Sequence, residues 1–445
     1  MKKKNIVKSS QGKVYLLIVA ILIIVWIVSV VLLSENKDKK AQLDLVAEAD
    51  KFLEDNIYIR AANSLTEALK YETDYNRDIE DKLLYVYKEG GFVGEYDALA
   101  RQRIEAGYAS KEEYTDVVQR LIDRDSKASA ITILKQALED YPDDVDLSKL
   151  YDDNRFDISY SNTGYSTYIN PVELISIPVS YENKWGYLDE TGRLAIDFEY
   201  KDVTPFFGEF AVVKKDAQYE LIDTSCNRWA IDKSGIDDVV TYNADLIVGK
   251  KGDEYGIYTQ TFAQMGTDFY EDIILNSNDL ICVKKNGRWA ILDSNLKQVT
   301  DFVFNDIVRN SKGEAFAGSF AVVADENGYF IADTEGRALF DNRYKLAKGM
   351  EEGYPAVSDG SGKWGFVNGD GELIIPCKYM DAKSFSCDVA PVYEAGEWRY
   401  ITKNDVVVYE NNLSVAEPFN EGCALAKDGN GNLLLLKLRY YEYYK

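Results

Sequence analysis

Carboxylates dominate the side chains of this sequence that could do chemistry. The chain has 75 Asp and Glu and no His. Ser-His-Asp or Cys-His nucleophile activation, His-based zinc sites and His proton shuttles are therefore excluded. Adjacent carboxylates, such as Glu351-Glu352 and Asp237-Asp238, could serve a glycosidase as general acid and base. In so acidic a chain such pairs are also expected on a solvated surface. We therefore expect no catalytic residue, no cofactor and no enzyme activity, and keep a carboxylate-based glycosidase as a remote alternative.

The cysteines give no sign of a metal site. The chain has five Cys, with no Cys-x-x-Cys pair and no zinc-like spacing. Cys282 and Cys423 lie in alternating apolar runs where the corresponding runs carry Val or Ala, which indicates small buried side chains. An odd count argues against a complete disulfide framework. A pairing of Cys377 with Cys387 stays open.

Length and charge limit the possible partners. At roughly 100 to 200 residues per domain, 445 residues predict two or three domains. Hydrophobic residues make up 46 % of the chain and only 8 Pro are present, so most of it should be folded. A formal net charge of −24 is unsuited to phosphate binding, and we expect no nucleic-acid partner.

One segment is apolar enough to cross a membrane. Val14 to Leu33 contains no charged residue, and twenty residues of helix would span about 30 Å, the thickness of a hydrocarbon core. The sequence SENKDKK follows it instead of a small-residue cleavage site, which indicates an uncleaved anchor. Residues 1–13 carry five Lys and predict a cytoplasmic tail. We expect a single-pass protein of the cell membrane with its C-terminal domains outside the cytoplasm.

Residues 41–155 have the periodicity of paired amphipathic helices. Apolar residues recur three and four apart, with few Gly or Pro. The small and large residues Ala49, Phe52, Tyr58, Ala61, Leu65 and Ala68 resemble the packing positions of a tetratricopeptide helix pair, and Ala130, Leu134 and Ala137 repeat part of the set. We expect about three helix pairs. Such arrays usually offer a groove to proteins, although a helical stalk that lifts the C-terminal domain off the membrane is the alternative.

Residues 165–445 predict an all-β domain of about eight units. The stretch ENKWGYLDETG, residues 182–192, recurs as imperfect repeats at intervals of 34 to 40 residues. An aromatic residue marks each of the first seven units, and Asn432 marks a weaker eighth; these aromatics are Trp185, Tyr219, Tyr255, Trp289, Tyr329, Trp364 and Trp398. Alternating runs on both sides of a Gly, Asn or Asp turn predict a β-hairpin, and a third apolar run follows it. Three or four short strands per unit is the size of a propeller blade.

The first and sixth units carry a family resemblance. Lys184-Trp185-Gly186-Tyr187-Leu188-Asp189 and Lys363-Trp364-Gly365-Phe366-Val367-Asn368, each followed by an apolar run and an aromatic-x-Asp corner, look like the WG-repeat family of bacterial surface and exported proteins. The resemblance covers about 270 residues, from about 172 to 439, and weakens where Tyr replaces the Trp, as at Tyr255-Gly256. It implies a repeat architecture and a binding role, with no catalytic residue and no particular ligand.

Packing explains the repeated residues. A Trp buries a large apolar area and can hold neighbouring hairpins together, and a Gly beside it permits close approach of a neighbouring backbone. The Asp after the second strand, at Asp189, Asp223, Asp293 and Asp333, is expected to begin a turn and accept backbone N–H groups. Calcium ligation is the alternative, but no Asp-x-Asp-x-Asp-Gly loop accompanies these residues.

Eight units are enough to close a propeller-like ring. The last unit has its hairpin but lacks a further strand before the terminal sequence RYYEYYK. We therefore expect residues from about Tyr165 to Val172 to supply its missing strand. An open β-solenoid is the alternative.

The predicted function is that of a non-catalytic, membrane-anchored scaffold that recognises a protein through its helical and β-repeat domains. The alternative is a surface protein that binds cell-wall or extracellular glycan through exposed aromatics. Loops that differ between units are the expected recognition elements. The longest step contains NSKGEAFAGS, residues 310–319, and this loop is the first candidate.

Overall fold

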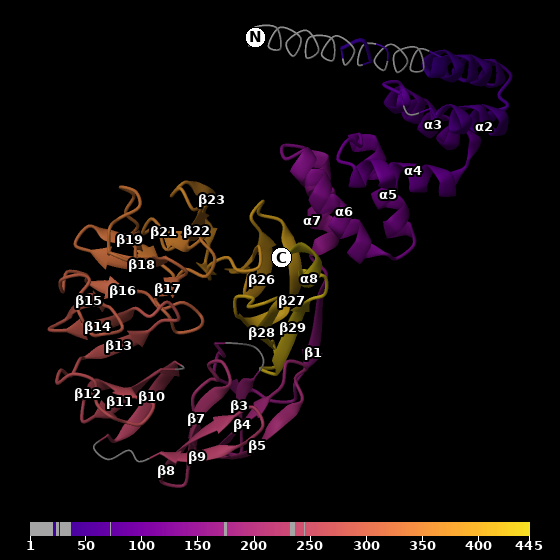
Figure 1. Ribbon diagram of the computed structural model, residues 1–445. Coiled ribbons are helices and arrows are strands. Elements are labelled where there is room, and N and C mark those ends of the chain that lie inside the picture. Colours follow the sequence, from indigo (N-terminus) through magenta and orange to yellow (C-terminus); the bar gives the residue numbers. More distant parts are fainter. Residues whose placement is uncertain are drawn as a thin grey trace, which may run out of the picture. The chain divides into compact units, whose positions relative to one another are not determined.

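The computed structural model describes residues 21–23, 26, 37–71, 73–172, 176–231, 236–243 and 245–445. The chain divides into two compact units, Met1–Asp152 and Asp153–Lys445. The first is helical and the second consists mainly of strands (Figure 1). A helical N-terminal region is therefore followed by an all-β repeat region, as the two periodicities predict.

The predicted anchor, Val14–Leu33, lies almost entirely outside the described residues, as does the basic tail before it. Within it only residues 21–23 and Trp26 are described, and they are helical. No helix in the part of the chain that the structure describes is both long and apolar enough to cross a bilayer.

The helical unit consists of antiparallel neighbours packed through small residues. A helix over residues 37–54 is followed by α2 (Tyr58–Ala68), α3 (Asn76–Gly90), α4 (Val93–Glu105), α5 (Lys111–Asp123), α6 (Lys127–Asp140) and α7 (Val145–Arg155), whose end belongs to the second unit. The alanines at the predicted packing positions, Ala49, Ala61, Ala68, Ala130 and Ala137, are fully buried. The short side chains of Ala61 and Ala68 let α2 lie against Leu83 and Ile79 of α3 in one apolar cluster.

Each repeat of the second unit is a small antiparallel sheet. The first four sheets contain β2 to β5 (Thr167–Tyr168, Ile177–Tyr181, Lys184–Leu188, Leu194–Tyr200), β6 to β9 (Asp202–Val203, Phe210–Lys215, Gln218–Asp223, Arg228–Ile231), β10 to β12 (Asp238–Asn243, Leu246–Lys251, Glu254–Thr259) and β13 to β15 (Asp272–Leu275, Ile281–Lys285, Arg288–Leu292). Two more contain β16 to β19 (Asp306–Ile307, Phe316–Ala317, Phe320–Asp325, Gly328–Asp333) and β20 to β23 (Leu346–Ala347, Ala356–Ser358, Trp364–Val367, Leu373–Tyr379).

The seventh and eighth units share one sheet. It contains β24 (Asp381–Ala382), β25 (Val389–Glu394), β26 (Glu397–Thr402), β27 (Val407–Ala416), β28 (Cys423–Asp428) and β29 (Leu433–Leu438), and its last position is taken by β1 (Ile158–Asn162). The long strand β27 pairs with β26 on one side and β28 on the other. A short helix, α8 (Tyr441–Tyr444), ends the chain.

The first strand of the β unit completes its last sheet. β1 runs antiparallel to β29, with Ser161 opposite Leu435, and the two lie side by side in Figure 1. This strand lies before the predicted segment Tyr165–Val172 and before the expected domain start at residue 165. Residues 167–168 pair instead with β3. The reason is that each unit needs its own first strand, and β2 fills that place in unit one. The completing strand must therefore come from the residues that precede it.

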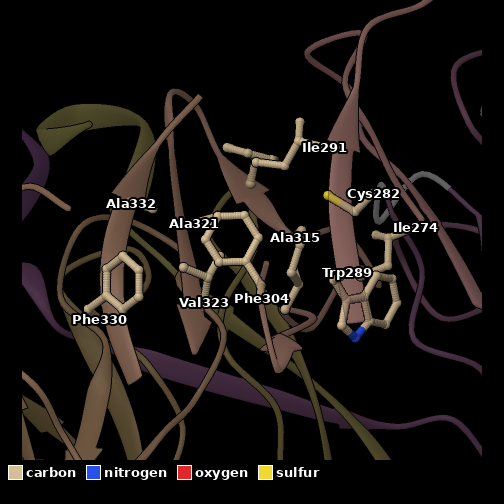
Figure 2. Close-up of a cluster of buried hydrophobic side chains, with 12 residues drawn as sticks. Ile274, Cys282, Trp289, Ile291, Phe304, Ala315, Ala321, Val323, Phe330 and Ala332 are labelled. Carbon is tan, nitrogen blue, oxygen red and sulfur yellow. The ribbon is translucent and has the colours of Figure 1, made fainter. Parts of the chain in front are cut away.

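Apolar clusters join each sheet to the next. In one of them Ile274, Cys282, Trp289 and Phe304 of unit four pack against unit five, including Phe330 (Figure 2). Comparable clusters join units one and two, two and three, three and four, five and six, and six and seven. Another contains Val179 and Leu188 of the first unit together with Leu425 and Leu435 of the last. The first and last repeats are thus in direct apolar contact.

Candidate functional site

The repeat aromatics occupy one structural position. Each lies at or near the start of the second hairpin strand: Trp185 on β4, Tyr219 on β8, Tyr255 on β12, Trp289 on β15, Tyr329 on β19, Trp364 on β22 and Trp398 on β26. Six of them pair with the backbone of the residue fifteen positions later, at Tyr200, Tyr270, Phe304, Tyr344, Tyr379 and Leu413. Trp289 is 2 % exposed and the other three of these Trp are half-buried. They are packing residues, and none lies open to a ligand as a flat platform.

The Gly of each Trp-Gly pair lies under a neighbouring strand. A Cβ on Gly186 would come within 2.5 Å of the Ile196 carbonyl oxygen, and one on Gly365 within 2.3 Å of the Ile375 carbonyl oxygen. The strand pairing shifts register at both places. Because backbone carbonyls cannot move away as a flexible side chain can, these positions exclude every side chain. The Trp-Gly pair therefore allows the strand that follows the hairpin, β5 in unit one and β23 in unit six, to approach closely.

The residue that ends each second strand caps a turn. One side-chain oxygen of Asp189 accepts the backbone N–H groups of Thr191 at 2.8 Å and Arg193 at 3.0 Å. Carboxylate or amide oxygens repeat this pattern at Asp223, Asp293, Asp333 and Asn368. Asp428 makes the same two bonds within the turn between β28 and β29. These bonds are those of an Asx turn. No group of three or more Asp, Glu or Cys side chains within the described residues is arranged to hold a metal ion.

A second feature, not expected from the sequence, links the units. Each unit has a leading strand (β2, β6, β10, β13, β16, β20, β24, or the end of β27 in the last unit), and we call the connection from it to the first hairpin strand the first loop of the unit. Side chains of first loops bond to the first loop of the next unit: Asn243 to Asn276, Ser277 to Glu314, Ser311 to Glu351, Glu352 to Cys387, Ser386 to Phe419 and Asn420 to Val172. This first-loop network runs from unit three to unit eight and on to unit one.

The loop of residues 310–319 belongs to that network. The side-chain oxygen of Asn276, which is 1 % exposed, accepts the N–H groups of Ala315 at 2.7 Å and Phe316 at 3.1 Å. The Ser311 N–H donates to Glu351 at 2.7 Å. The loop that the sequence singled out for recognition is thus held by the units before and after it.

A cavity of about 220 Å³ adjoins this loop. Strands β10 and β13 form one wall, and residues of the loop, including Lys312 and Glu314, form another. Arg309 binds Asp272 with both terminal nitrogens, at 2.6 and 3.1 Å. The Arg309 guanidinium is therefore already paired with a carboxylate, which favours a structural role for this part of the cavity wall.

The candidate catalytic carboxylates have structural partners. Glu351 accepts the N–H of Ser311 in unit five, whereas Glu352 accepts the N–H of Cys387 in unit seven. The two carboxyl groups therefore bond in different directions. Asp237 accepts the Gly252 N–H, and Asp238 pairs with Lys214 at 3.2 Å. Burial raises the pKa of Glu351 to about 7, because a charged carboxylate is less well solvated inside the fold.

This raised pKa predicts a pH dependence of stability. The folded chain binds a proton at Glu351 that the unfolded chain releases above about pH 4.5. The stability that this bound proton contributes is fully present below that pH and is lost as the pH rises through 7. The loss is about 3 kcal/mol, the free energy that corresponds to a pKa of about 7 in the folded chain and 4.5 in the unfolded chain. Glu351→Gln keeps an acceptor for Ser311 and should remove this loss.

The measurement is urea unfolding of the β unit, followed by tryptophan fluorescence between pH 4.5 and 7.5. The stability of the wild type relative to Glu351→Gln should fall across this range, and the same comparison with the exposed Glu190→Gln should stay level. Parallel curves for the wild type and Glu351→Gln would contradict the assignment.

The helical unit contains a larger groove, whose lining residues the sequence did not single out. It has a volume of about 550 Å³, and α3, the end of α4 and the start of α5 contribute to its lining. Four tyrosines, Tyr85, Tyr96, Tyr108 and Tyr141, line it together with charged side chains. Tyr85 is 55 % exposed. The available signal was the spacing of Asp81, Tyr85 and Lys88, which places them on one face of a helix.

A buried ion-pair network supports the groove. Arg103 is 5 % exposed and donates to Glu113 at 2.9 Å, and it also contacts Asp81 at 2.6 Å. Ser110 and Glu113 form a reciprocal capping box at the start of α5. Removal of either Arg103 or Glu113 would leave a buried charge, which disfavours separation of the pair at this wall of the groove.

The five cysteines are all free thiols, Cys377 and Cys387 among them. Cys282 is fully buried in the cluster between units four and five, and its burial raises the thiol pKa to about 12. It packs as a small apolar side chain.

Comparison with known proteins identifies the repeat. Residues 185–219 and 364–398 match the family model of the WG containing repeat, and each match runs from one repeat aromatic to the next. No curated protein matches the chain. Among solved structures, the chain is similar to PorZ, a surface component of the type-IX secretion system of Porphyromonas gingivalis, at 12 % identity and a TM-score of 0.27 over 59 % of this chain and 44 % of that one.

Two further structures cover most of their own length. Hsv2 of Kluyvelomyces marxianus is 10 % identical with a TM-score of 0.30 over 62 % of this chain and 97 % of that one. The N-terminal domain of Nup159 is 9 % identical with a TM-score of 0.30 over 63 % and 96 %. The chain thus spans less than half of PorZ and nearly all of the other two. The β unit carries WG-containing repeats, matched in its first and sixth units.

Proposed function

We propose that this protein is a non-catalytic scaffold, anchored in the membrane by residues 14–33 with its folded units outside the cytoplasm, that seats a protein partner on its helical unit. The observation that carries the proposal is the groove of about 550 Å³ in that unit. An exposed Tyr in a concave, rigid surface is typical of a protein-binding site, because tyrosine buries a large area at little cost in side-chain entropy.

Paired helices support a tetratricopeptide-like array as the source of this groove. α2 packs on α3, and α5 packs on α6, with buried alanines between them. Arrays of this kind bury a core only by stacking, and the stacking leaves a concave face. The proposed partner occupies that face.

For the β unit we propose a closed, propeller-like ring that acts as a rigid platform. Three observations support closure: the pairing of β1 with β29, the apolar cluster shared by the first and last repeats, and the bond from Asn420 to the Val172 carbonyl at 2.9 Å. A ring removes the exposed strand edges that an open array would present.

Cross-linking capture from membranes, with the anchor intact, tests the binding role. Tyr85→Ser should lower recovery of the partner by about tenfold or more, as expected for an interface hot spot. Ile59→Ser, which changes a side chain that is 59 % exposed on α2 of the same unit, is the matched control and should leave recovery unchanged. Equal recovery with both variants would contradict a partner in the groove and leave the helices as a stalk.

Glycan binding is a second candidate, favoured by one observation. Tyr165, Tyr181 and Phe198 form a cluster with ring centroids 5.3 to 6.4 Å apart, and Tyr181 is 54 % exposed. An exposed ring of this kind can stack on a sugar. Cosedimentation with wall polysaccharide should weaken in Tyr181→Ala if this candidate is right, and unchanged sedimentation would eliminate it.

A further inference from the structure

One face of α3 lines the groove. Asp81, Leu84, Tyr85 and Lys88 are spaced i, i+3, i+4 and i+7, so they share a face of the helix. The opposite side of α3 is committed to the core, where Ile79, Leu83 and Val86 pack with α2. The groove face is therefore held in place by packing behind it. Of its four side chains Leu84 is buried and Lys88 is paired with Glu112, whereas Asp81 and Tyr85 are exposed to a partner.

Guanidinium groups already stack on two of the other three tyrosines of this groove, Tyr96 and Tyr108. Arg77 lies 4.6 Å and Arg103 5.2 Å from the ring centre of Tyr108, and Arg120 lies 4.6 Å from that of Tyr96. Such contacts are cation–π interactions. Tyr85 is the most exposed tyrosine of the groove, and the structure describes no cation of the chain over its ring.

The charge around the groove is unbalanced. The lining residues and their direct ion-pair partners include five carboxylates, Glu80, Asp81, Glu112, Glu113 and Asp116, and two cations, Lys88 and Arg103. With Arg77 and Arg120, which lie over Tyr108 and Tyr96, carboxylates still outnumber cations by one. The most exposed of the carboxylate side chains are Asp81, at 62 %, and Glu112, at 72 %. The ion pair between Arg103 and Asp81 uses the Oδ1 atom. A carboxylate can accept more than one donor, so Asp81 can take a second cation.

We propose that the groove recognises an arginine side chain of the partner segment, which stacks on Tyr85 and pairs with Asp81 one helical turn away. This inference rests on the proposed function and names the chemistry of the partner. Arginine fits better than lysine, because its planar guanidinium stacks on an aromatic ring and donates to a carboxylate at the same time. Glu112, on the facing helix, adds to the negative field that attracts it.

Arginine recognition is tested by measuring, through fluorescence anisotropy, how tightly labelled peptides bind to the full chain in neutral detergent. The probes are a (Gly-Arg-Gly-Ser)3 peptide and the same peptide with citrulline, which keeps the shape of arginine without its charge. The arginine peptide should bind about tenfold more tightly or better. Asp81→Asn combined with Glu112→Gln should weaken it by about tenfold, and Tyr85→Leu by about two- to fivefold, as expected for an exposed cation–π contact.

Asp44→Asn combined with Glu48→Gln is the matched control. Both residues are exposed on the helix over residues 37–54, and the pair removes the same charge from the same unit. It should change the affinity by less than about twofold, since neither residue lines the groove and interactions between exposed charges are weakened by salt. Equal weakening by the two double variants would show attraction to net charge alone and overturn the inference.

Two other outcomes separate this inference from the function on which it rests. If arginine and citrulline peptides bind alike, or neither binds, arginine recognition is wrong, whereas loss of partner capture in Tyr85→Ser would still support the groove as a docking site. If capture from membranes is unaffected by Tyr85→Ser, the docking function itself is wrong.

Discussion

Leu435→Ala is expected to lower the free energy of unfolding of the β unit by about 3 to 5 kcal/mol. Leu435 is 1 % exposed and lies on β29, opposite Ser161 of β1. It belongs to the cluster that joins the last repeat to Val179 and Leu188 of the first. Truncation there removes apolar contacts and leaves a cavity at the place where the two ends of the unit meet.

Urea unfolding followed by tryptophan fluorescence measures this effect, because five of the six Trp lie in the β unit. Leu373→Ala, at a leucine that is 53 % exposed on β23, is the control and should cost less than about 0.5 kcal/mol. Hydrogen exchange should show that β1 and β29 lose protection first in Leu435→Ala. A cost below about 1 kcal/mol, with β1 still protected, would contradict the joining of the ends through this cluster.

Gly365→Ala is expected to destabilise the β unit by about 2 to 3 kcal/mol, in the range of an overpacked core. The added Cβ would lie 2.3 Å from the Ile375 carbonyl oxygen and 2.7 Å from the Cys377 nitrogen. Both are backbone atoms of β23, so the strand itself must shift. The loss should appear as a lower urea midpoint and as faster hydrogen exchange in β23.

Gly369→Ala is the matched control, four residues away. An added Cβ there meets nothing within 4 Å, and the residue is not among those with positive φ. Its stability should therefore stay within about 1 kcal/mol of the wild type, with a gain possible from the stiffer unfolded chain. If both variants have the same midpoint, close strand approach does not explain the Trp-Gly pair.

The repeat could be predicted because its signals are local. An aromatic at the start of a strand and an Asp that caps the following turn act within one hairpin, so they leave a readable period in the sequence. The third strand was harder to predict. The apolar run after Trp289 forms only isolated bridges, at Phe304 and Gln298, and the Thr300 hydroxyl accepts the Ile291 N–H in place of a backbone carbonyl.

Features that depend on distant residues could not be predicted. The strand that completes the last sheet, Ile158–Asn162, is recognisable only when β29 is known to lack a neighbour and β2 is known to be occupied. The first-loop network joins residues such as Ser311 and Glu351, which are forty positions apart and have no shared pattern. The groove combines α3 with the start of α5, and neither segment is unusual by itself.

The most direct test of the proposed function is site-specific photo-cross-linking in the native membrane. A photoreactive phenylalanine is placed at position 85 or, as a control, at position 59, and each is combined with Asp81→Asn and Glu112→Gln. A groove that seats a basic partner segment predicts a discrete adduct from position 85, none from position 59, and loss of the adduct when the two carboxylates are neutralised. The same adducts from both positions, or no adduct from position 85, would contradict it.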